Sequence, residues 1–139
     1  YAVIADQLSK KFNVIFSGLA DQKDLINDIL DKCQNKKKIF NLAGKTNMEQ
    51  FCALIKNSKL VLAPDTGASH LAASFGVPLV NLMDAPIEEW APIGKKDKVI
   101  NIYHPREIAI LENAKLFSKV GGVKSISVEE VKKAIDKLV

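Results

Sequence analysis

The sequence predicts a doubly wound α/β protein with a mostly parallel sheet. Short apolar runs alternate along the chain with segments whose apolar residues recur at helical spacing. Turn residues follow three of these runs, where strands of such a sheet would end. This alternation is typical of parallel sheets covered by helices. A chain of 139 residues fits one domain with a sizeable core, so we expect a single domain over residues 1–139.

In the first half, two strands are predicted to alternate with three helices. Gly44-Lys45-Thr46 does not form a P-loop, because that motif requires glycine five positions before Gly44, where Ile39 lies. Thr46 and Glu49 instead have the spacing of a capping box. The predicted elements are helix 1–8, strand 12–16, helix 25–33, strand 39–42 and a helix that begins near residue 46.

The second half is predicted to continue the alternation. Gly76-Val77-Pro78 ends a helix that begins near residue 66. Ser127 and Glu130 have capping-box spacing, and the apolar stripe Val128, Val131, Ile135 and Leu138 follows them. The other predicted elements are strands 59–63, 79–82 and 99–102, a proline-bearing loop over 84–94, and a helix over 106–119.

The composition narrows the possible classes of protein. Hydrophobic residues make up 47% and charged residues 26%, which is usual for soluble globular proteins. No apolar run is long enough to span a bilayer, and no signal peptide is visible at the start. The first residue is Tyr1 rather than Met, so we expect a piece of a longer protein.

The net charge of +4 comes almost entirely from lysines, and Arg106 is the only arginine. The lysines are scattered, with short runs at 36–38 and 95–96, and we interpret them as solvated loop residues. A weak attraction to anionic ligands or lipid headgroups is the alternative. Nucleic-acid readers usually place arginines and aromatics on one face, so no nucleic-acid partner is expected.

The two cysteines, Cys33 and Cys52, lie on apolar helical stripes. Two isolated cysteines form neither a metal site nor a disulfide framework. We expect both to be buried and reduced, which suits the cytoplasm.

The stretch over residues 60–73 carries the most chemistry. Asp65 and Thr66 lie where a helix N-cap belongs, and Gly67 lets another group approach the backbone closely. Free N–H groups and the helix dipole favour an anion there. His70 falls about one turn later, so its ring can lean back over that position. This pattern predicts a phosphate-binding turn; a well-capped core helix with a surface histidine is the alternative.

Two other turns are expected to join this one. In a doubly wound sheet, ligands bind beyond the carboxyl ends of the strands. Residues 18–22, 43–46 and 64–67 all lie at such ends. We therefore expect the three turns to converge on one crevice.

Three motifs together resemble glycosyltransferase family 9, the ADP-heptose:lipopolysaccharide heptosyltransferase family. They are Leu-Ala-Gly-Lys-Thr at 42–46, Asp-Thr-Gly-x-x-His-x-Ala-Ala at 65–73 and Gly-Val-Pro at 76–78. Each motif alone is weak, but the combination is specific. The resemblance covers most of the chain and is strongest over 39–94, and residues 126–131 are also similar to the family's C-terminal helix.

The resemblance implies a GT-B enzyme with two Rossmann-like halves and no metal or other cofactor. This chain would be the C-terminal, donor-binding half, incomplete at its N-terminus. Such an enzyme moves a heptose from ADP-heptose onto the lipopolysaccharide inner core, in the cytoplasm and in peripheral contact with the inner membrane. The catalytic base and the site for the lipid-linked saccharide acceptor would lie in the N-terminal half, so the chain alone is expected to be inactive.

A central strand would precede Tyr1 in such a domain. We therefore expect a gap in the sheet, or a gap filled by an unusual pairing or an oligomer contact.

The donor-binding residues implied by the resemblance are Asp65, Thr66, Gly67, His70, Lys45, Thr46 and Gln22. The first four would line the donor diphosphate, and the backbone around Lys45 and Thr46 would border the adenine. Gln22 falls where the family often has an acidic residue for the ribose, and an amide binds a hydroxyl more weakly than a carboxylate does. Preformed N–H groups at Thr66 and Gly67 would stabilise charge on the leaving diphosphate. Asp65 would not bind the diphosphate directly, because like charges repel. Its expected role is to hold the turn or to orient His70.

Two other functions are weighed against this one. A non-catalytic nucleotide-binding or scaffold module on the same fold stays open, because fold does not fix function. A hydrolase using Ser69, His70 and Asp65 is disfavoured, because adjacent residues on a helix point in different directions. No Gly-x-Ser-x-Gly elbow is present either.

Overall fold

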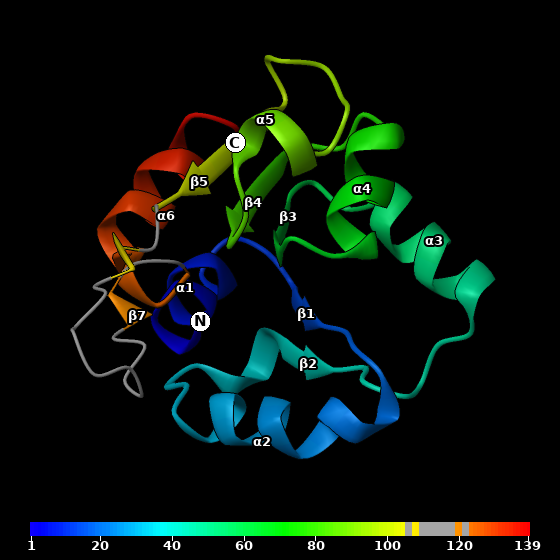
Figure 1. Ribbon diagram of the computed structural model, residues 1–139. Coiled ribbons are helices and arrows are strands. Elements are labelled where there is room, and N and C mark those ends of the chain that lie inside the picture. Colours follow the sequence, from blue (N-terminus) through cyan, green and yellow to red (C-terminus); the bar gives the residue numbers. More distant parts are fainter. Residues whose placement is uncertain (105–106, 109–118, 121–122) are drawn as a thin grey trace. The chain divides into compact units, whose positions relative to one another are not determined.

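The computed structural model describes residues 1–104, 107–108, 119–120 and 123–139 (Figure 1). The chain divides into two compact units, Tyr1–Ala53 and Leu54–Val139. The division falls within helix α3 (Met48–Lys56). Each unit is built on its own set of parallel strands.

The first unit contains a parallel pair of strands, β1 (Val14–Phe16) and β2 (Ile39–Asn41). Helix α1 (Ala2–Ser9) precedes β1, and helix α2 (Lys23–Asp31) connects the two strands. Short 3₁₀ turns, η1 (Ala20–Gln22) and η2 (Lys36–Lys38), stand on either side of α2. The core brings together Ala5 of α1, Cys33 beyond α2 and Ile39 of β2, with Val14, Phe16, Ala2 and Leu30 packed around them.

The second unit contains three parallel strands in the order β3 (Val61–Pro64), β4 (Leu79–Met83) and β5 (Val99–Tyr103). Helix α4 (Gly67–Ser74) packs against β3 and β4, and helix α6 (Val128–Asp136) packs against β4 and β5. All five residues of β4 are buried. Because alternate side chains of a strand point to opposite faces, both faces of β4 are covered.

Smaller elements complete the second unit. The predicted proline-bearing loop contains a short helix, α5 (Ile87–Trp90). Strands β6 (Glu107–Ile108) and β7 (Lys119–Val120) pair in antiparallel fashion, and a 3₁₀ turn, η3 (Val123–Ser125), precedes α6.

The α/β class and the parallel pairing are confirmed. Among the described residues the parallel strands form two ladders, β1–β2 and β3–β4–β5, with no hydrogen-bonded strand joining them.

Three local predictions are wrong. The predicted helix over 106–119 fails at Glu107–Ile108, which is strand β6, and at Lys119, which begins β7; residues 106 and 109–118 lie outside the described residues. The capping box of α3 lies one residue later than predicted: Asn47 Oδ1 accepts from the N–H of Gln50 (2.8 Å), and Gln50 Oε1 accepts from the N–H of Asn47 (3.0 Å). Val128 of the α6 stripe is exposed.

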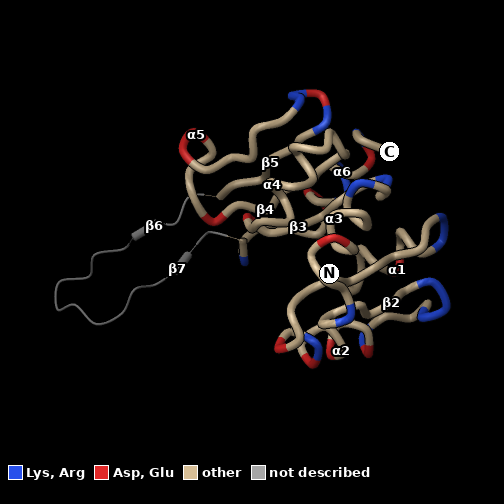
Figure 2. Tube along the Cα trace, turned by 90° about the vertical axis from the view of Figure 1, so that its right-hand side faces the viewer, with Lys and Arg blue, Asp and Glu red and all other residues tan. Residues whose placement is uncertain are grey.

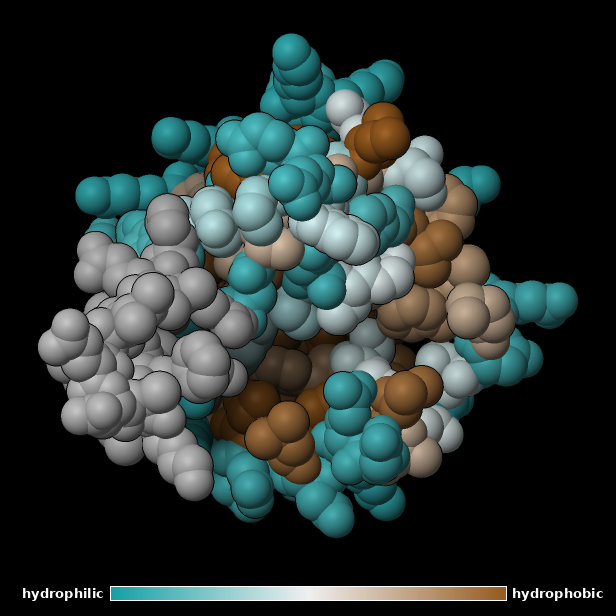
Figure 3. Space-filling view, viewed as in Figure 1, coloured by the Kyte–Doolittle hydropathy of each residue, from teal (hydrophilic) through white to brown (hydrophobic). Residues whose placement is uncertain are grey.

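Acidic and basic residues occupy many short segments of the trace (Figure 2). Hydrophilic side chains cover much of the face shown in Figure 3. None of the helices within the described ranges has the length and apolar character needed to cross a membrane. Both cysteines are free thiols; Cys33 is buried, as predicted, whereas Cys52 is only partly buried.

Candidate functional site

The turn after β3 is held by its own polar side chains. Thr66 is the N-cap of α4 and has an extended backbone. Its Oγ1 donates to the carbonyl of Pro64 (3.2 Å), and Thr66 and Ser69 together have the arrangement of a capping box. Ser69 Oγ accepts from the N–H of Thr66 (3.2 Å) and donates to the Thr66 carbonyl (2.7 Å). These bonds fix the turn, and the N–H groups of Ser69 (3.0 Å) and His70 (3.3 Å) also donate to the Thr66 carbonyl.

The N–H groups of Gly67 and Ala68 are available at this helix start. In the part of the chain that the structure describes, no acceptor takes either of them. A Cβ added at Gly67 would meet nothing within 4 Å, and the backbone of Gly67 is not in the left-handed region. Neither packing nor backbone conformation of the protein requires glycine here. The absence of a side chain therefore leaves open space directly beside two free N–H donors.

Asp65, which precedes α4, and His70, in its first turns, form a pair. Asp65 Oδ1 lies 3.4 Å from His70 Nε2, with the aspartate side chain 18% exposed and the histidine 52% exposed. The N–H of Asp65 donates to the carbonyl of Leu82 on the neighbouring strand (3.1 Å), which anchors the turn to the sheet. The carboxylate thus faces one ring nitrogen of His70 and leaves Nδ1 for another partner.

Ser69 does not have the surroundings of a nucleophile. Its side chain is completely buried, and its hydroxyl is bonded to the backbone of Thr66 on both sides. A hydrolase built on Ser69, His70 and Asp65 is therefore excluded.

The other two predicted turns contact each other in the first unit. The N–H of Gly44 donates to the carbonyl of Gly18 (3.0 Å). Gly44 has a positive φ of 69°, and a Cβ there would lie 2.9 Å from both Cα and Cβ of Ala20. The structure therefore brings together residues 18–22 and 43–46. The turn at 64–67 belongs to the second unit, so the convergence of all three stays a prediction.

Gln22 and Lys45 are both engaged in holding these turns. Gln22 Oε1 accepts from the N–H of Leu19 (3.0 Å), which leaves the Nε2 group of Gln22 as a donor. Lys45 Nζ donates to the carbonyl of Asn41 (2.9 Å), at the carboxyl end of β2. The side chain of Lys45 is thus turned back towards its own strand, and Thr46 next to it is partly buried.

Comparison with known proteins decides the family. The model of glycosyltransferase family 9 (heptosyltransferase) matches residues 1–120. The chain belongs to this family.

Several lipopolysaccharide heptosyltransferases are similar in sequence to part of this chain. The lipopolysaccharide core heptosyltransferase OpsX of Haemophilus influenzae is 34% identical over 108 residues, covering 74% of this chain and 30% of its own. Lipopolysaccharide heptosyltransferase 2 of Salmonella typhimurium is 32% identical over 111 residues, covering 75% of this chain and 32% of its own. The chain thus spans about a third of the length of these relatives.

Solved structures agree with the family assignment. The structure of E. coli ADP-heptose lps heptosyltransferase II superimposes with a TM-score of 0.80 and 25% identity, over 99% of this chain and 40% of that one. A glycosyl transferase family 9 structure from Veillonella parvula gives a TM-score of 0.73 at 22% identity, over 99% and 39%. The resemblance noted from the motifs is confirmed, as is the GT-B type of fold.

A further polar cluster lies at the carboxyl ends of β4 and β5 in the family 9 chain. Asp84 Oδ1 accepts from the N–H of Val123 (3.1 Å). His104 Nε2 lies 2.8 Å from Glu130 Oε1, and its Nδ1 lies 2.9 Å from Ser125 Oγ. These contacts connect residues 123–130, which lead into α6, to the carboxyl ends of β4 and β5.

The pKa of Glu130 is lowered to about 2 by three hydrogen bonds. The largest contribution comes from the Ser127 hydroxyl, the next from the Ser127 backbone N–H, and the third from His104. Sequence reasoning identified Ser127 and Glu130 only as a cap and did not identify His104. The sequence feature that could have identified His104 is its position directly after a strand, because polar binding groups lie at the carboxyl ends of the strands in parallel sheets.

Proposed function

We propose that this chain is the donor-binding part of a glycosyltransferase that transfers a heptose from ADP-heptose to the lipopolysaccharide inner core. Family membership supports this proposal, as do the names of the relatives, which are lipopolysaccharide heptosyltransferases. Because the chain spans only 30–32% of those relatives, the proposed activity is that of a full-length protein containing it. The catalytic base and the acceptor site are assigned to the remainder of that protein.

The open start of α4 is the observation that carries the proposal. The N–H groups of Gly67 and Ala68 have no acceptor among the described residues, a Cβ at Gly67 would meet nothing within 4 Å, and His70 lies one turn further along the same helix. The start of a helix favours negative charge, and a diphosphate supplies several oxygens to such donors. From the sequence, the two donors were expected at Thr66 and Gly67. Since the Thr66 N–H is taken by Ser69, the proposed pair moves one residue along.

The same groups would assist the transfer step. As the bond between the sugar and the diphosphate breaks, negative charge builds on the departing phosphate oxygens. Donors at Gly67 and Ala68 that are already in place stabilise this charge without reorganising. His70 donates to the same oxygens through Nδ1 when it is protonated, while Asp65 accepts from Nε2 and keeps the ring oriented.

The first unit would bind the nucleoside of the donor. Gln22 can donate through Nε2 to a ribose hydroxyl oxygen, because its Oε1 is already used within the turn. The backbone around Lys45 and Thr46 borders the adenine in this proposal. The full-length protein would work in the cytoplasm, in peripheral contact with the inner membrane.

Calorimetry with ADP and the full-length protein tests the proposal. We expect ADP to bind, and His70→Ala to weaken binding by about 1–3 kcal/mol, because a charge-assisted hydrogen bond is lost. His104→Ala is the matched control, since its ring is bonded to Glu130 and Ser125 instead, and it should leave ADP affinity unchanged. Absence of ADP binding, or equal losses in both variants, contradicts the proposal. ADP binding by a full-length protein that transfers no heptose would favour the non-catalytic module.

A further inference from the structure

Six exposed lysines gather at one edge of the first unit. In the sequence they form separate groups, but β1 and β2 are parallel, with Val14 opposite Ile39. Residues that precede the two strands therefore lie at the same edge, opposite the edge where the strands end. This lysine edge consists of Lys10, Lys11, Lys32, Lys36, Lys37 and Lys38.

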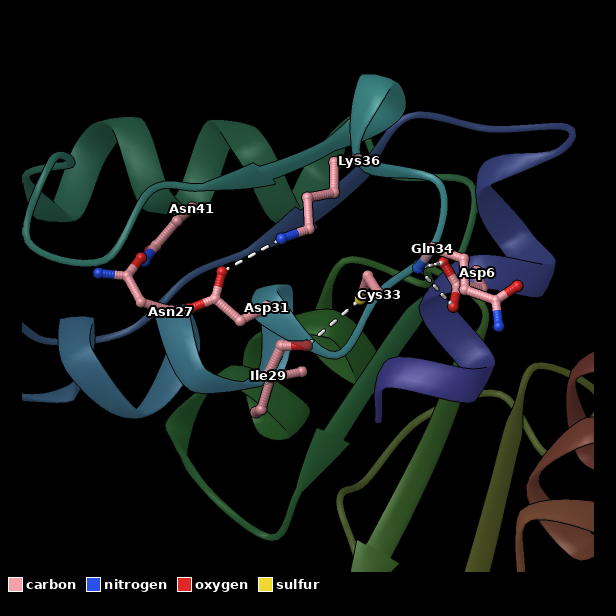
Figure 4. Close-up of polar contacts among 8 residues, drawn as sticks. All are labelled: Asp6, Asn27, Ile29, Asp31, Cys33, Gln34, Lys36 and Asn41. Atoms are coloured by element: carbon pink, nitrogen blue, oxygen red, sulfur yellow. Dashed lines mark hydrogen bonds and ion pairs between the residues drawn. The ribbon is translucent and has the colours of Figure 1, made fainter.

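Hydrogen bonds hold the two groups of lysines together. The Asp6 carboxylate accepts from the N–H groups of Gln34 (2.9 and 3.0 Å) and Asn35 (2.9 Å). The Asn35 side chain donates to Ser9 Oγ (3.0 Å). The donation from Asn35 and then from Gln34 holds the pKa of Asp6 below its usual range. Figure 4 shows the contact between Asp6 and Gln34, and Figure 2 shows two blue turns side by side. The lysines at 10–11 and at 36–38 thus directly follow residues that are bonded to one another.

The carboxylates at this edge do not cancel its charge. Asp6 is occupied by backbone N–H groups, and Asp31 pairs with Lys36 at 3.1 Å (Figure 4). Six lysines and these two aspartates carry a net charge of +4, which equals the formal net charge of the whole chain. Positive charge is therefore in excess here and balanced elsewhere. Lys11, Lys37 and Lys38 have no ion-pair partner among the described residues.

The proposed donor site does not account for this charge. The turns at 18–22 and 43–46 follow β1 and β2, at the opposite edge of the same sheet. All six residues are exposed, and none of them is an arginine. A lysine carries a point charge at the end of a flexible side chain. Planar recognition of bases or of single phosphates favours arginine, whereas an extended anionic surface needs only accumulated charge.

We propose that the lysine edge binds the surface of an anionic phospholipid bilayer. Clusters of four to eight basic residues are attracted to anionic lipid headgroups, with about 1 kcal/mol, or fivefold in affinity, for each residue near the surface. The choice of a lipid surface rests on the proposed function, because a lipopolysaccharide acceptor is held in a membrane. The edge would bring the enzyme to that membrane without inserting into it.

Vesicle sedimentation of the full-length protein tests this inference. Vesicles of phosphatidylcholine are compared with vesicles that also contain phosphatidylglycerol. We expect binding only to the anionic vesicles, and a loss with rising salt because exposed charges are screened. The triple variant Lys11→Gln/Lys37→Gln/Lys38→Gln should lower the partition coefficient on the order of 100-fold. The control Lys95→Gln/Lys96→Gln/Lys133→Gln removes the same charge from the second unit and should change it little.

The outcomes separate this inference from the proposed function. Equal losses in the two triple variants, equal binding to neutral vesicles, or binding of heparin or DNA without vesicle binding overturns the lysine edge as a membrane site. ADP affinity is measured on the same preparations and should be unchanged in both variants. Retained ADP binding without vesicle binding overturns only the membrane inference. Vesicle binding lost selectively in the first variant, without any ADP binding, overturns only the proposed donor site.

Discussion

The starts of α4 and α6 use similar residue types in opposite ways. At α6, Ser127 Oγ accepts from the N–H of Glu130 (3.2 Å), and Glu130 Oε2 accepts from the N–H (2.9 Å) and the hydroxyl (2.7 Å) of Ser127. At α4, the Thr66 hydroxyl donates backwards to Pro64, and the first N–H groups of the helix have no acceptor among the described residues. At both helix starts the first two N–H groups have no acceptor among the described residues. The third is taken by the Ser127 side chain at α6 (3.2 Å) and by the Thr66 carbonyl at α4 (3.0 Å), and only α4 begins with a glycine, Gly67.

This difference separates a structural cap from a candidate ligand site. A helix start needs acceptors for its first N–H groups, and side chains, water or a ligand can supply them. Capping residues at α6 therefore stabilise the fold, whereas glycine at α4 keeps the position accessible to an anion. Changes at α4 should affect ligand affinity, and changes at α6 should affect stability.

Gly67→Ala should produce the largest effect. The new Cβ meets nothing within 4 Å in the protein, so the free energy of unfolding should hardly change. It would occupy the space through which a diphosphate approaches the N–H donors. We expect ADP affinity to fall on the order of 100-fold, as charge-assisted hydrogen bonds are lost. Calorimetry with ADP measures this loss.

Gly76→Ala is the control for the glycine substitution. Gly76 follows the C-cap of α4 with a positive φ of 67°, and a Cβ there would also meet nothing within 4 Å. Alanine there should cost about 1–2 kcal/mol of stability through backbone strain, without affecting ADP. Unchanged ADP affinity in Gly67→Ala would show that α4 is a capped structural helix only.

Ser127→Ala should lower the free energy of unfolding by about 1 kcal/mol, because the α6 cap is lost. Urea denaturation measures this change, and Ser127→Thr should retain most of the stability. ADP affinity should be the same in all three proteins. A loss of ADP affinity comparable to that in Gly67→Ala would erase the proposed distinction between the two helix starts.

Acidification should give the smallest effect. The pKa of Glu130 is lowered to about 2 in the fold, from an ordinary value of about 4.3. A lowered carboxyl pKa contributes stability that is fully present above about pH 4.3 and is lost as the pH falls towards 2. Denaturation of Glu130→Gln should therefore show a shallower loss of stability between about pH 5 and pH 2. Identical pH dependence in both proteins would show that Glu130 is not held as a carboxylate.

Local patterns predicted most elements but not their exact starts. The α6 cap was correct because only one capping pair precedes its apolar stripe. At α3 two overlapping pairs, Thr46–Glu49 and Asn47–Gln50, fit the same spacing, and the structure uses the second. At the α4 start, the sequence could not show that Ser69 takes the N–H of Thr66.

Contacts between residues far apart in the sequence were the main feature that could not be predicted from it. The lysines were interpreted as scattered because residues 10–11 and 36–38 are far apart along the chain. Only the parallel pairing of β1 with β2, and the bonds from Asp6 to the turn before η2, place them together. His104 and Glu130 were likewise joined by contacts across 26 positions, which no local pattern reveals.

The close approach of Gly44 to Ala20 has a consequence for engineering the proposed nucleoside-binding loops. Any side chain at Gly44 would collide with the backbone and side chain of Ala20, 2.9 Å away. The two loops therefore fit each other at this contact, and variants that place a side chain at position 44 while keeping Ala20 would clash there. Redesign of the proposed nucleoside-binding loops therefore has to vary residues 20 and 44 together.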